Sequence, residues 1–116
     1  MDIKQEDLIK FWTYFGFQFR RPLPEYSMGI PSEKDWYSPF DKHHTCQLPQ
    51  ITLASLYKYV IPKLQDKGYQ SELIALTHGK FAVSLTDMYS GEQIIIESKQ
   101  PTEALYKAIM AVIDKG

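Results

Sequence analysis

Three runs of alternating apolar and polar residues, separated by short turn sequences, occupy the stretch from residue 69 to residue 97. The turn pair His78-Gly79 follows the first run and Tyr89-Ser90-Gly91 follows the second, and both are typical of tight connections. Tight connections join neighbouring strands in the antiparallel sense. The expected strands are Tyr69 to Thr77, Lys80 to Thr86 and Gln93 to Glu97. The middle strand places Phe81, Val83 and Leu85 on one face, so we predict an antiparallel meander with one buried side.

A helix is predicted on each side of this meander. Before it, Thr52 is a suitable N-cap and Gly68 a suitable helix end. The apolar stripe between them is Leu53, Leu56, Tyr57, Val60, Ile61 and Leu64. Pro62 lies inside this helix, where a proline costs about 3 kcal/mol, so we expect a kink or an early break. The closing helix begins at Pro101 and carries the stripe Ala104, Leu105, Ala108, Ile109, Val112 and Ile113.

The order helix, three strands, helix predicts an α+β fold. Two striped helices and a one-sided sheet bury their apolar faces most simply as a two-layer α/β sandwich. Before this core of residues 50–114, the sequence predicts a helix over about residues 4–15 and a short strand at Phe17 to Arg20, both within segment 1–21. A chain of 116 residues has the length of one ordinary domain, so we expect residues 1–116 to form a single domain with two to three helices.

Residues 22–49 lack a regular pattern and are predicted to form a long loop. Five prolines and Gly29 interrupt every run of regular structure in this segment. The segment nevertheless contains aromatic and aliphatic side chains of the kind that pack against other surfaces. Loops of this length within small proteins are commonly functional.

Composition limits the classes of partner and compartment. The formal net charge of −1 and the isoelectric point near 6.3 provide no basic field to attract nucleic acid, which disfavours that partner. Cys46 is the single cysteine, which excludes an internal disulfide. The first residues show no secretory signal and no stretch approaches the length of a membrane span, so the expected location is the cytoplasm, without a membrane partner.

No motif in the sequence specifies a reaction. His43, His44 and Cys46 include metal-binding side chains, but their spacing is not a zinc pattern. Cys46 also lacks the local signature of a catalytic thiol, and a packed structural role is the simpler interpretation. Phosphate-binding glycine motifs are absent as well. We therefore predict a protein that is not an enzyme and that needs no cofactor or metal.

The candidate binding residues surround the only pair of adjacent arginines. Guanidinium groups beside aromatic rings bind phosphate or protein side chains, and Arg, Trp and Tyr dominate binding hot spots. The predicted binding set is Arg20, Arg21, Tyr26, Trp36 and Tyr37.

The element order resembles two known families. It is similar to the double-stranded RNA-binding domain, although that family places a lysine cluster at the start of its last helix, where this chain has Lys99 and Lys107 beside Glu97 and Glu103. A second resemblance, over about residues 53–113, is to the phage α-β-α sandwich family. The similar residues are Leu53, Leu56, Val60, Leu64, Gly68-Tyr69, Phe81-Ala82-Val83, Pro101-Thr102-Glu103-Ala104-Leu105 and Ala108. This second resemblance implies a phage or prophage accessory protein and carries no catalytic residues.

The leading hypothesis is a non-enzymatic binding protein that contacts a bacterial host protein, such as an inhibitor of a bacterial defence system. The alternatives are a nucleic-acid-binding module, a protein that sequesters a small ligand, and an enzyme or metalloprotein that uses His43, His44 and Cys46. The oligomeric state stays open, because exposure of Ile61 and Ile95 would favour a homodimer.

Overall fold

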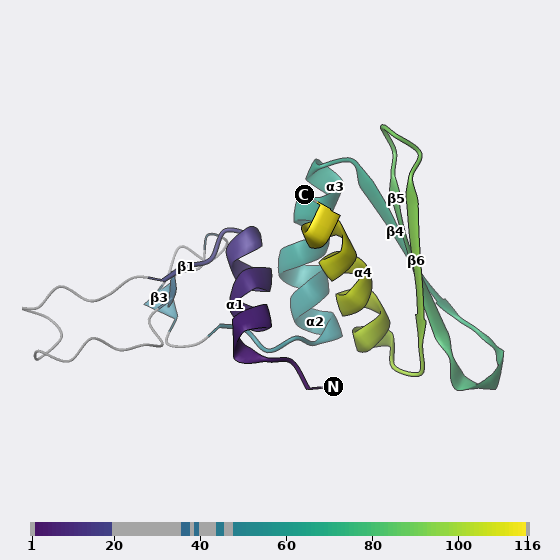
Figure 1. Cartoon of the computed structure of the whole chain (residues 1–116), viewed down its shortest axis with the longest axis horizontal. Helices are drawn as coiled ribbons and strands as arrows, with labels where there is room; N and C mark the ends of the chain where they lie inside the picture. Colours follow the sequence, from purple (N-terminus) through teal and green to yellow (C-terminus); the bar gives the residue numbers. More distant parts are fainter. Residues whose placement is uncertain (1, 20–35, 38, 40–43, 46–47, 116) are drawn as a thin grey trace, which may run out of the picture. The chain divides into compact units, whose positions relative to one another are not determined.

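The α+β fold predicted from the sequence is confirmed by a computed structural model, which describes residues 2–19, 36–37, 39, 44–45 and 48–115. Residue contacts group the chain into two compact units, residues 2–49 and residues 50–116. The second unit contains a three-stranded antiparallel sheet with helices, as the two-layer sandwich requires (Figure 1).

The sheet of the second unit has the strand order β4-β5-β6. Its strands are β4 (Tyr69–Ala75), β5 (Phe81–Asp87) and β6 (Gln93–Ser98). In the central register, Val83 lies between Leu73 of β4 and Ile96 of β6. Because successive side chains alternate between faces, Phe81, Val83 and Leu85 share one face, and the last two are fully buried. This confirms the predicted meander and its buried side.

The two connections of the meander are tight, as the sequence predicts. Thr77–Gly79 form a short 3-10 turn between β4 and β5, in which His78 adopts a left-handed conformation with φ of 64°. Leu76 donates its amide to the carbonyl of Lys80 at 2.7 Å and closes this hairpin. The second connection, between β5 and β6, is described with the candidate site.

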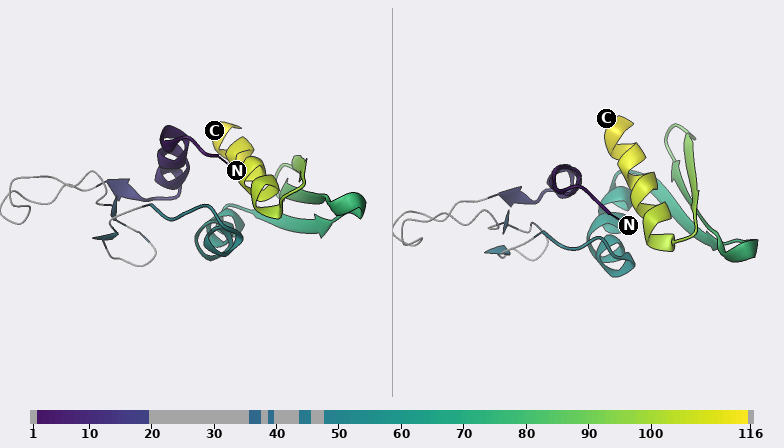
Figure 2. Two further views of the ribbon diagram at one scale, coloured as in Figure 1. Left: turned by 90° about the horizontal axis from the view of Figure 1, so that it is seen from below. Right: turned by 60° about the horizontal axis from the view of Figure 1, so that its bottom comes forward.

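Helix α4 (Pro101–Lys115) begins at the predicted proline and covers one face of the sheet, over β5 and β6. Figures 1 and 2 show it against the same side of the sheet in every view. Its buried residues are Ala104, Leu105, Tyr106, Ala108, Ile109, Val112 and Ile113. These residues and the inner side chains of β5 form the core that holds helix and sheet together.

The helical segment before the sheet contains a π-helical section that resolves the problem posed by Pro62. It runs as α2 (Leu53–Ser55), a π-helix η1 (Leu56–Val60) and α3 (Ile61–Asp66). The wider π turn places Pro62 in the first turn of α3, where a missing amide hydrogen costs least. The predicted kink or break is therefore replaced by a change of helix type. Thr52 is the N-cap as predicted, in a capping box with Ser55.

In the first unit, α1 (Gln5–Tyr14) matches the predicted helix closely. The short strand predicted at Phe17 to Arg20 is found as β1 (Gln18–Phe19). Two further strands, β2 (Trp36–Tyr37) and β3 (His44–Thr45), lie within the segment predicted to be a loop. Together they form a second antiparallel sheet in the order β1-β2-β3.

Aromatic side chains form the core of the first unit. The indole of Trp12 is fully buried, and its Nε1 donates a hydrogen bond of 2.9 Å to the carbonyl of Pro49. The rings of Phe11 and Phe17 meet this indole edge to face, with centroids 5.0 and 5.1 Å away. Such geometry is the preferred one for aromatic pairs, and it fixes the turn after α1.

Candidate functional site

The structure describes only part of the predicted binding set. Arg20, Arg21 and Tyr26 lie outside the described residues. Trp36 and Tyr37 form β2, paired on one side with β1 and on the other with β3. Of the five predicted binding residues, the structure therefore places only Trp36 and Tyr37, in the middle strand of the small sheet.

The residues considered for metal binding are also described only in part. His44 belongs to β3, where it pairs with Tyr37 of β2. His43 and Cys46 lie outside the described residues. Within the described ranges, no three His, Cys, Asp or Glu side chains gather in a way that could hold a metal ion.

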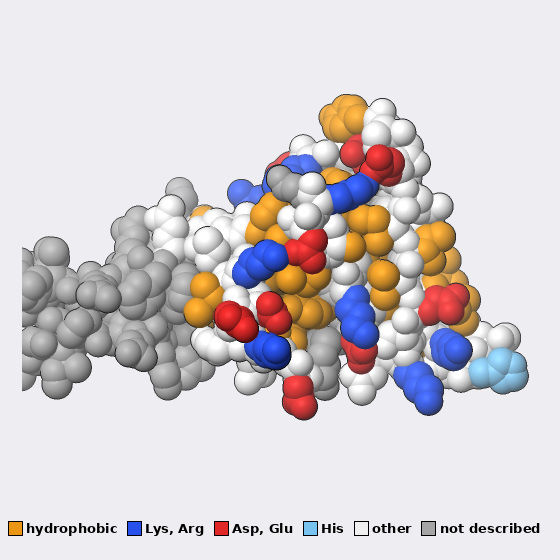
Figure 3. Space-filling model, in the orientation of Figure 1, with side chains coloured by type: hydrophobic (Ala, Val, Ile, Leu, Met, Phe, Trp, Pro, Cys, Tyr) orange, Lys and Arg blue, Asp and Glu red, His pale blue; other side chains and the backbone are white. Residues whose placement is uncertain are grey.

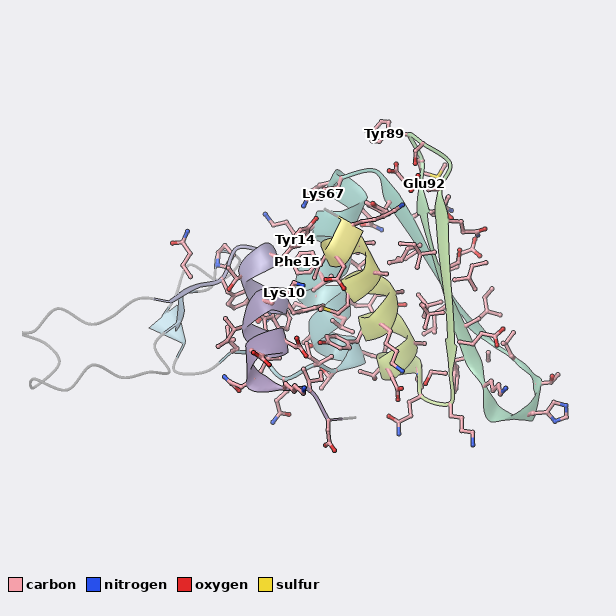
Figure 4. The ribbon with its side chains drawn as sticks, viewed as in Figure 1. Lys10, Tyr14, Phe15, Lys67, Tyr89 and Glu92 are labelled. Carbon is pink, nitrogen blue, oxygen red and sulfur yellow. The ribbon has the colours of Figure 1, made fainter. Side chains whose placement is uncertain are left out.

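The most exposed large apolar side chains of the second unit lie at the connection between β5 and β6. We call residues 87–92 the hairpin tip. Tyr89 is 86% exposed and Met88 is 61% exposed. Figure 4 shows Tyr89 projecting from the outer end of this hairpin, with Glu92 nearby, and Figure 3 shows hydrophobic atoms at the same place beside acidic ones. An aromatic ring and a thioether displayed together are typical of protein-binding surfaces.

A network of hydrogen bonds fixes the backbone of the hairpin tip. The Asp87 carboxylate accepts from the amide of Tyr89 at 2.9 Å and from the amide of Ser90 at 3.4 Å. The carbonyl of Asp87 accepts a hydrogen bond of 2.7 Å from the amide of Gly91. The amide of Asp87 donates one of 2.8 Å to the carbonyl of Glu92. The amide of Glu92 donates to the Ser90 hydroxyl at 3.2 Å. Tyr89 and Met88 are therefore displayed on a closed turn.

The hydrogen bonds of this turn favour the ionised form of the Asp87 carboxyl. The amide of Tyr89, followed by groups of Ser90 and the charge of Lys115, holds the pKa of the Asp87 carboxyl below its ordinary value of 3.8. A lowered pKa in the folded protein means that the carboxylate favours folding above the ordinary value. This contribution is lost as the pH falls through the lowered pKa.

Two contacts attach the hairpin tip to the rest of the second unit. The amide of Met88 donates to the carbonyl of Gly68, between α3 and β4, at 2.9 Å. At the other side of the tip, Glu92 forms an ion pair with Lys115 at the end of α4. Both ionic side chains are more than half exposed, so this pair contributes little to stability.

The ring of Tyr89 lies directly against Gly68. A Cβ atom added at Gly68 would be 2.2 Å from Cε2 of the ring, which is far inside contact distance. Gly68 also has φ of +90°, a conformation that costs other residues about 1–2 kcal/mol. Gly68 therefore serves two purposes: its positive φ ends the helical segment after α3, and its lack of a side chain leaves room for the Tyr89 ring.

Replacing Gly68 by alanine should lower the free energy of unfolding by more than the same change at Gly91. Both glycines have positive φ, so both substitutions add about 1–2 kcal/mol of backbone strain. Only Gly68→Ala also pushes the Tyr89 ring aside, since nothing lies within 4 Å of a Cβ at Gly91. Because this ring is 86% exposed and can turn toward solvent, the excess should be small compared with the backbone strain. Urea denaturation of both variants measures the difference. The difference between the two stability losses should vanish when Tyr89 is replaced by serine. A difference that persists in the Tyr89→Ser background would contradict the contact between Gly68 and the Tyr89 ring.

A second uncovered surface is the side of the sheet that faces away from α4, which we call the outer face. Its residues are Gln70, Glu72, Ile74, Ala82, Ser84, Thr86, Gln93, Ile95 and Glu97. Ile95 is 58% exposed and Ile74 is 46% exposed. Figure 3 shows hydrophobic side chains on this side of the sheet, near an acidic one. Of the two isoleucines whose exposure would favour a homodimer, Ile95 is exposed, whereas Ile61 is buried like most residues of the apolar stripe.

The sequence predicts the turn at Tyr89-Ser90-Gly91 but gives it no binding role. One signal was available: two large apolar residues, Met88 and Tyr89, occupy a hairpin connection where small polar residues are usual. Their exposure follows from the register of β5 and β6, which places both residues beyond the last paired position.

Comparison with known proteins gives no relative of this chain. No protein-family model matches the sequence, and no match was found among curated proteins or solved structures. The resemblance to the phage α-β-α sandwich family therefore stays a prediction. In the part of the chain that the structure describes, no helix combines the length and the apolar character that a membrane span needs.

Proposed function

We propose that this chain is a non-enzymatic binding protein that acts by protein–protein contact through the hairpin tip. The observation that carries the proposal is the exposure of Tyr89 and Met88 on a turn closed by hydrogen bonds. Following the resemblance to the phage family, we place the protein in the cytoplasm of a bacterial host and take a host protein, such as a defence protein, as its partner.

The physical argument rests on the cost of ordering a surface when it binds. An immobilised side chain loses about 0.5–1.5 kcal/mol of conformational freedom on association. At the hairpin tip the backbone is already fixed through Asp87 and Gly68, so the partner orders little beyond the two side chains. The Tyr89 ring touches Gly68 on one side and is otherwise exposed, so a partner can reach it without any change in the backbone. Preorganised aromatic anchors of this kind supply a large share of binding energy at protein interfaces.

The composition of the tip indicates the kind of surface that it fits. Tyr89 and Met88 supply apolar area, and Asp87 and Glu92 supply negative charge at neutral pH. A complementary partner surface has a hydrophobic pocket for the ring and donors or a cation at its rim.

The proposal is tested by affinity capture from bacterial lysate with the double variant Met88→Ser/Tyr89→Ser. A partner recovered with the wild-type chain should be lost, because hot-spot truncations reduce affinity by about 30-fold or more. Tyr57→Ser is the matched control, since Tyr57 is a partly exposed tyrosine (44%) on the helical segment, far from the tip in sequence. A partner captured equally by both variants would contradict the assignment of the tip. Far-ultraviolet circular dichroism verifies that both variants fold.

A further inference from the structure

The outer edge of β6 carries no strand among the described residues. β6 pairs with β5 along its whole length and ends the sheet order β4-β5-β6. The backbone groups on its other side are therefore available to another strand. Free edges in natural proteins are usually protected by charged side chains, especially lysine, by proline or by a bulge within the strand. β6 has the sequence Gln-Ile-Ile-Ile-Glu-Ser, with no lysine or proline, and its register with β5 is continuous. Its one charged side chain, Glu97, lies near the end of the strand and leaves the three central isoleucines unprotected.

The sequence of β6 is suited to pair with a second copy of itself. In an antiparallel pair centred on Ile95, each Ile95 lies opposite its equivalent on the outer face. Gln93 then lies opposite Glu97 of the other copy, which avoids contact between like charges. On the inner face, Ile94 lies opposite Ile96, so the apolar layer beneath α4 continues across the junction.

The position of α4 fits the same arrangement. This helix covers both β5 and β6, so its axis lies over the space between them, about half a strand spacing inside the edge. With strands about 4.8 Å apart, two α4 helices related by the pairing would lie on the order of 10 Å apart. Helices pack side by side at about 8–10 Å. The second copy therefore meets the first in both layers.

The other free edge of the sheet is less suited to self-pairing. The middle of β4 carries Glu72 on the outer face, and pairing centred there would place this carboxylate opposite its equivalent. In addition, helix α3 contacts β4, which leaves less space beside this strand for a second copy.

We propose that two copies of this chain associate through antiparallel pairing of β6 with β6, centred on Ile95, to form one six-stranded sheet. The interface is two-fold symmetric and closed, because each copy uses its single β6 edge once. This inference rests on the sheet edge and is independent of the proposed role of the hairpin tip.

The test is light scattering of the full chain after size-exclusion chromatography, at chain concentrations up to about 100 μM. The wild-type chain should have twice the 13.5 kDa mass of one copy. Ile95→Lys places two ammonium groups opposite each other and should raise the dissociation constant about tenfold or more. Ile74→Lys is the matched control, because Ile74 lies on the same outer face but on β4, at the opposite edge of the sheet from β6, and this variant should remain dimeric.

A charge-reversal mixture tests the register. Ile95→Glu alone should be as monomeric as Ile95→Lys, whereas an equal mixture of the two chains should form a heterodimer through a Lys–Glu pair. Recovery in the mixture also shows that both variants are folded. A monomeric wild-type chain, equal effects at positions 74 and 95, or a mixture that stays monomeric would overturn the proposal.

Discussion

Leu85→Ala should lower the free energy of unfolding by about 2–5 kcal/mol. Leu85 is fully buried in the central strand β5, between Ser71 and Ile94 of the neighbouring strands and on the face covered by α4. Truncation removes the transfer free energy of three carbon atoms and leaves a cavity that strands held on both sides cannot close. Urea denaturation followed by circular dichroism measures this loss.

Leu76→Ala is the control for Leu85→Ala, because it deletes the same atoms at a site that is 37% exposed, just after β4. Its effect should be well below that of Leu85→Ala, at about 1 kcal/mol or less. Comparable losses for the two variants would contradict the placement of the core between α4 and the sheet.

Trp12→Ala should also lower the free energy of unfolding strongly, by about 3–5 kcal/mol. The substitution removes a fully buried indole, its ring contacts with Phe11 and Phe17, and the hydrogen bond to the carbonyl of Pro49. This hydrogen bond joins two residues far apart in sequence, so its loss should loosen the whole first unit. Thermal or urea unfolding of the variant gives the magnitude.

Trp12→Phe separates the two contributions of the indole. A phenyl ring keeps part of the packing but cannot donate to Pro49, so this variant should lose less stability than Trp12→Ala. The hydrogen-bond part is about 0.5–1.5 kcal/mol. If Trp12→Ala were as stable as the wild-type chain, the aromatic core of residues 2–49 would be wrong.

The sheet and the closing helix follow from sequence because their periods are unambiguous. Alternation through Phe81, Val83 and Leu85 is typical of a strand with one buried face, and Pro101 directly before an apolar stripe favours the start of a helix. The glycine-containing turns then fix the antiparallel order. Here the local preferences and the buried faces agree, so the expected strands differ from the observed ones only at their ends.

The π-helical section could not be predicted, because its signal is a conflict between two patterns. The apolar stripe through Val60 and Ile61 favours one continuous helix, while Pro62 opposes it. Sequence periodicity predicts that the conflict must be relieved but does not specify how. The structure relieves it by inserting a wider turn before the proline.

The short strands and the hairpin tip show a different limit. Two-residue strands such as Trp36–Tyr37 are too short for alternation to be visible, and their pairing depends on residues elsewhere in the chain. Exposure of Tyr89 likewise depends on where the β5–β6 pairing ends. The sequence predicted binding through arginine and aromatic residues but assigned it to Arg20, Arg21, Tyr26, Trp36 and Tyr37, whose role as a binding site stays a prediction.

The two proposals have a joint consequence for function. In the β6-paired dimer the strands run in opposite directions, so the two hairpin tips would lie at opposite ends of the six-stranded sheet. A dimer of this form would present Tyr89 twice, and a partner with repeated sites would be held by both tips with higher avidity. Ile95→Lys would then weaken capture of such a partner without altering the tip itself.

The most direct test of the binding role is photo-cross-linking from the hairpin tip. Tyr89 is replaced by the photoreactive residue p-benzoylphenylalanine, and in a second chain the same replacement is made at Tyr57, which is also an exposed tyrosine of the second unit. After irradiation in bacterial cells, position 89 should give a discrete adduct with another protein, and position 57 should not. Adducts from position 57 but none from position 89 would contradict the account.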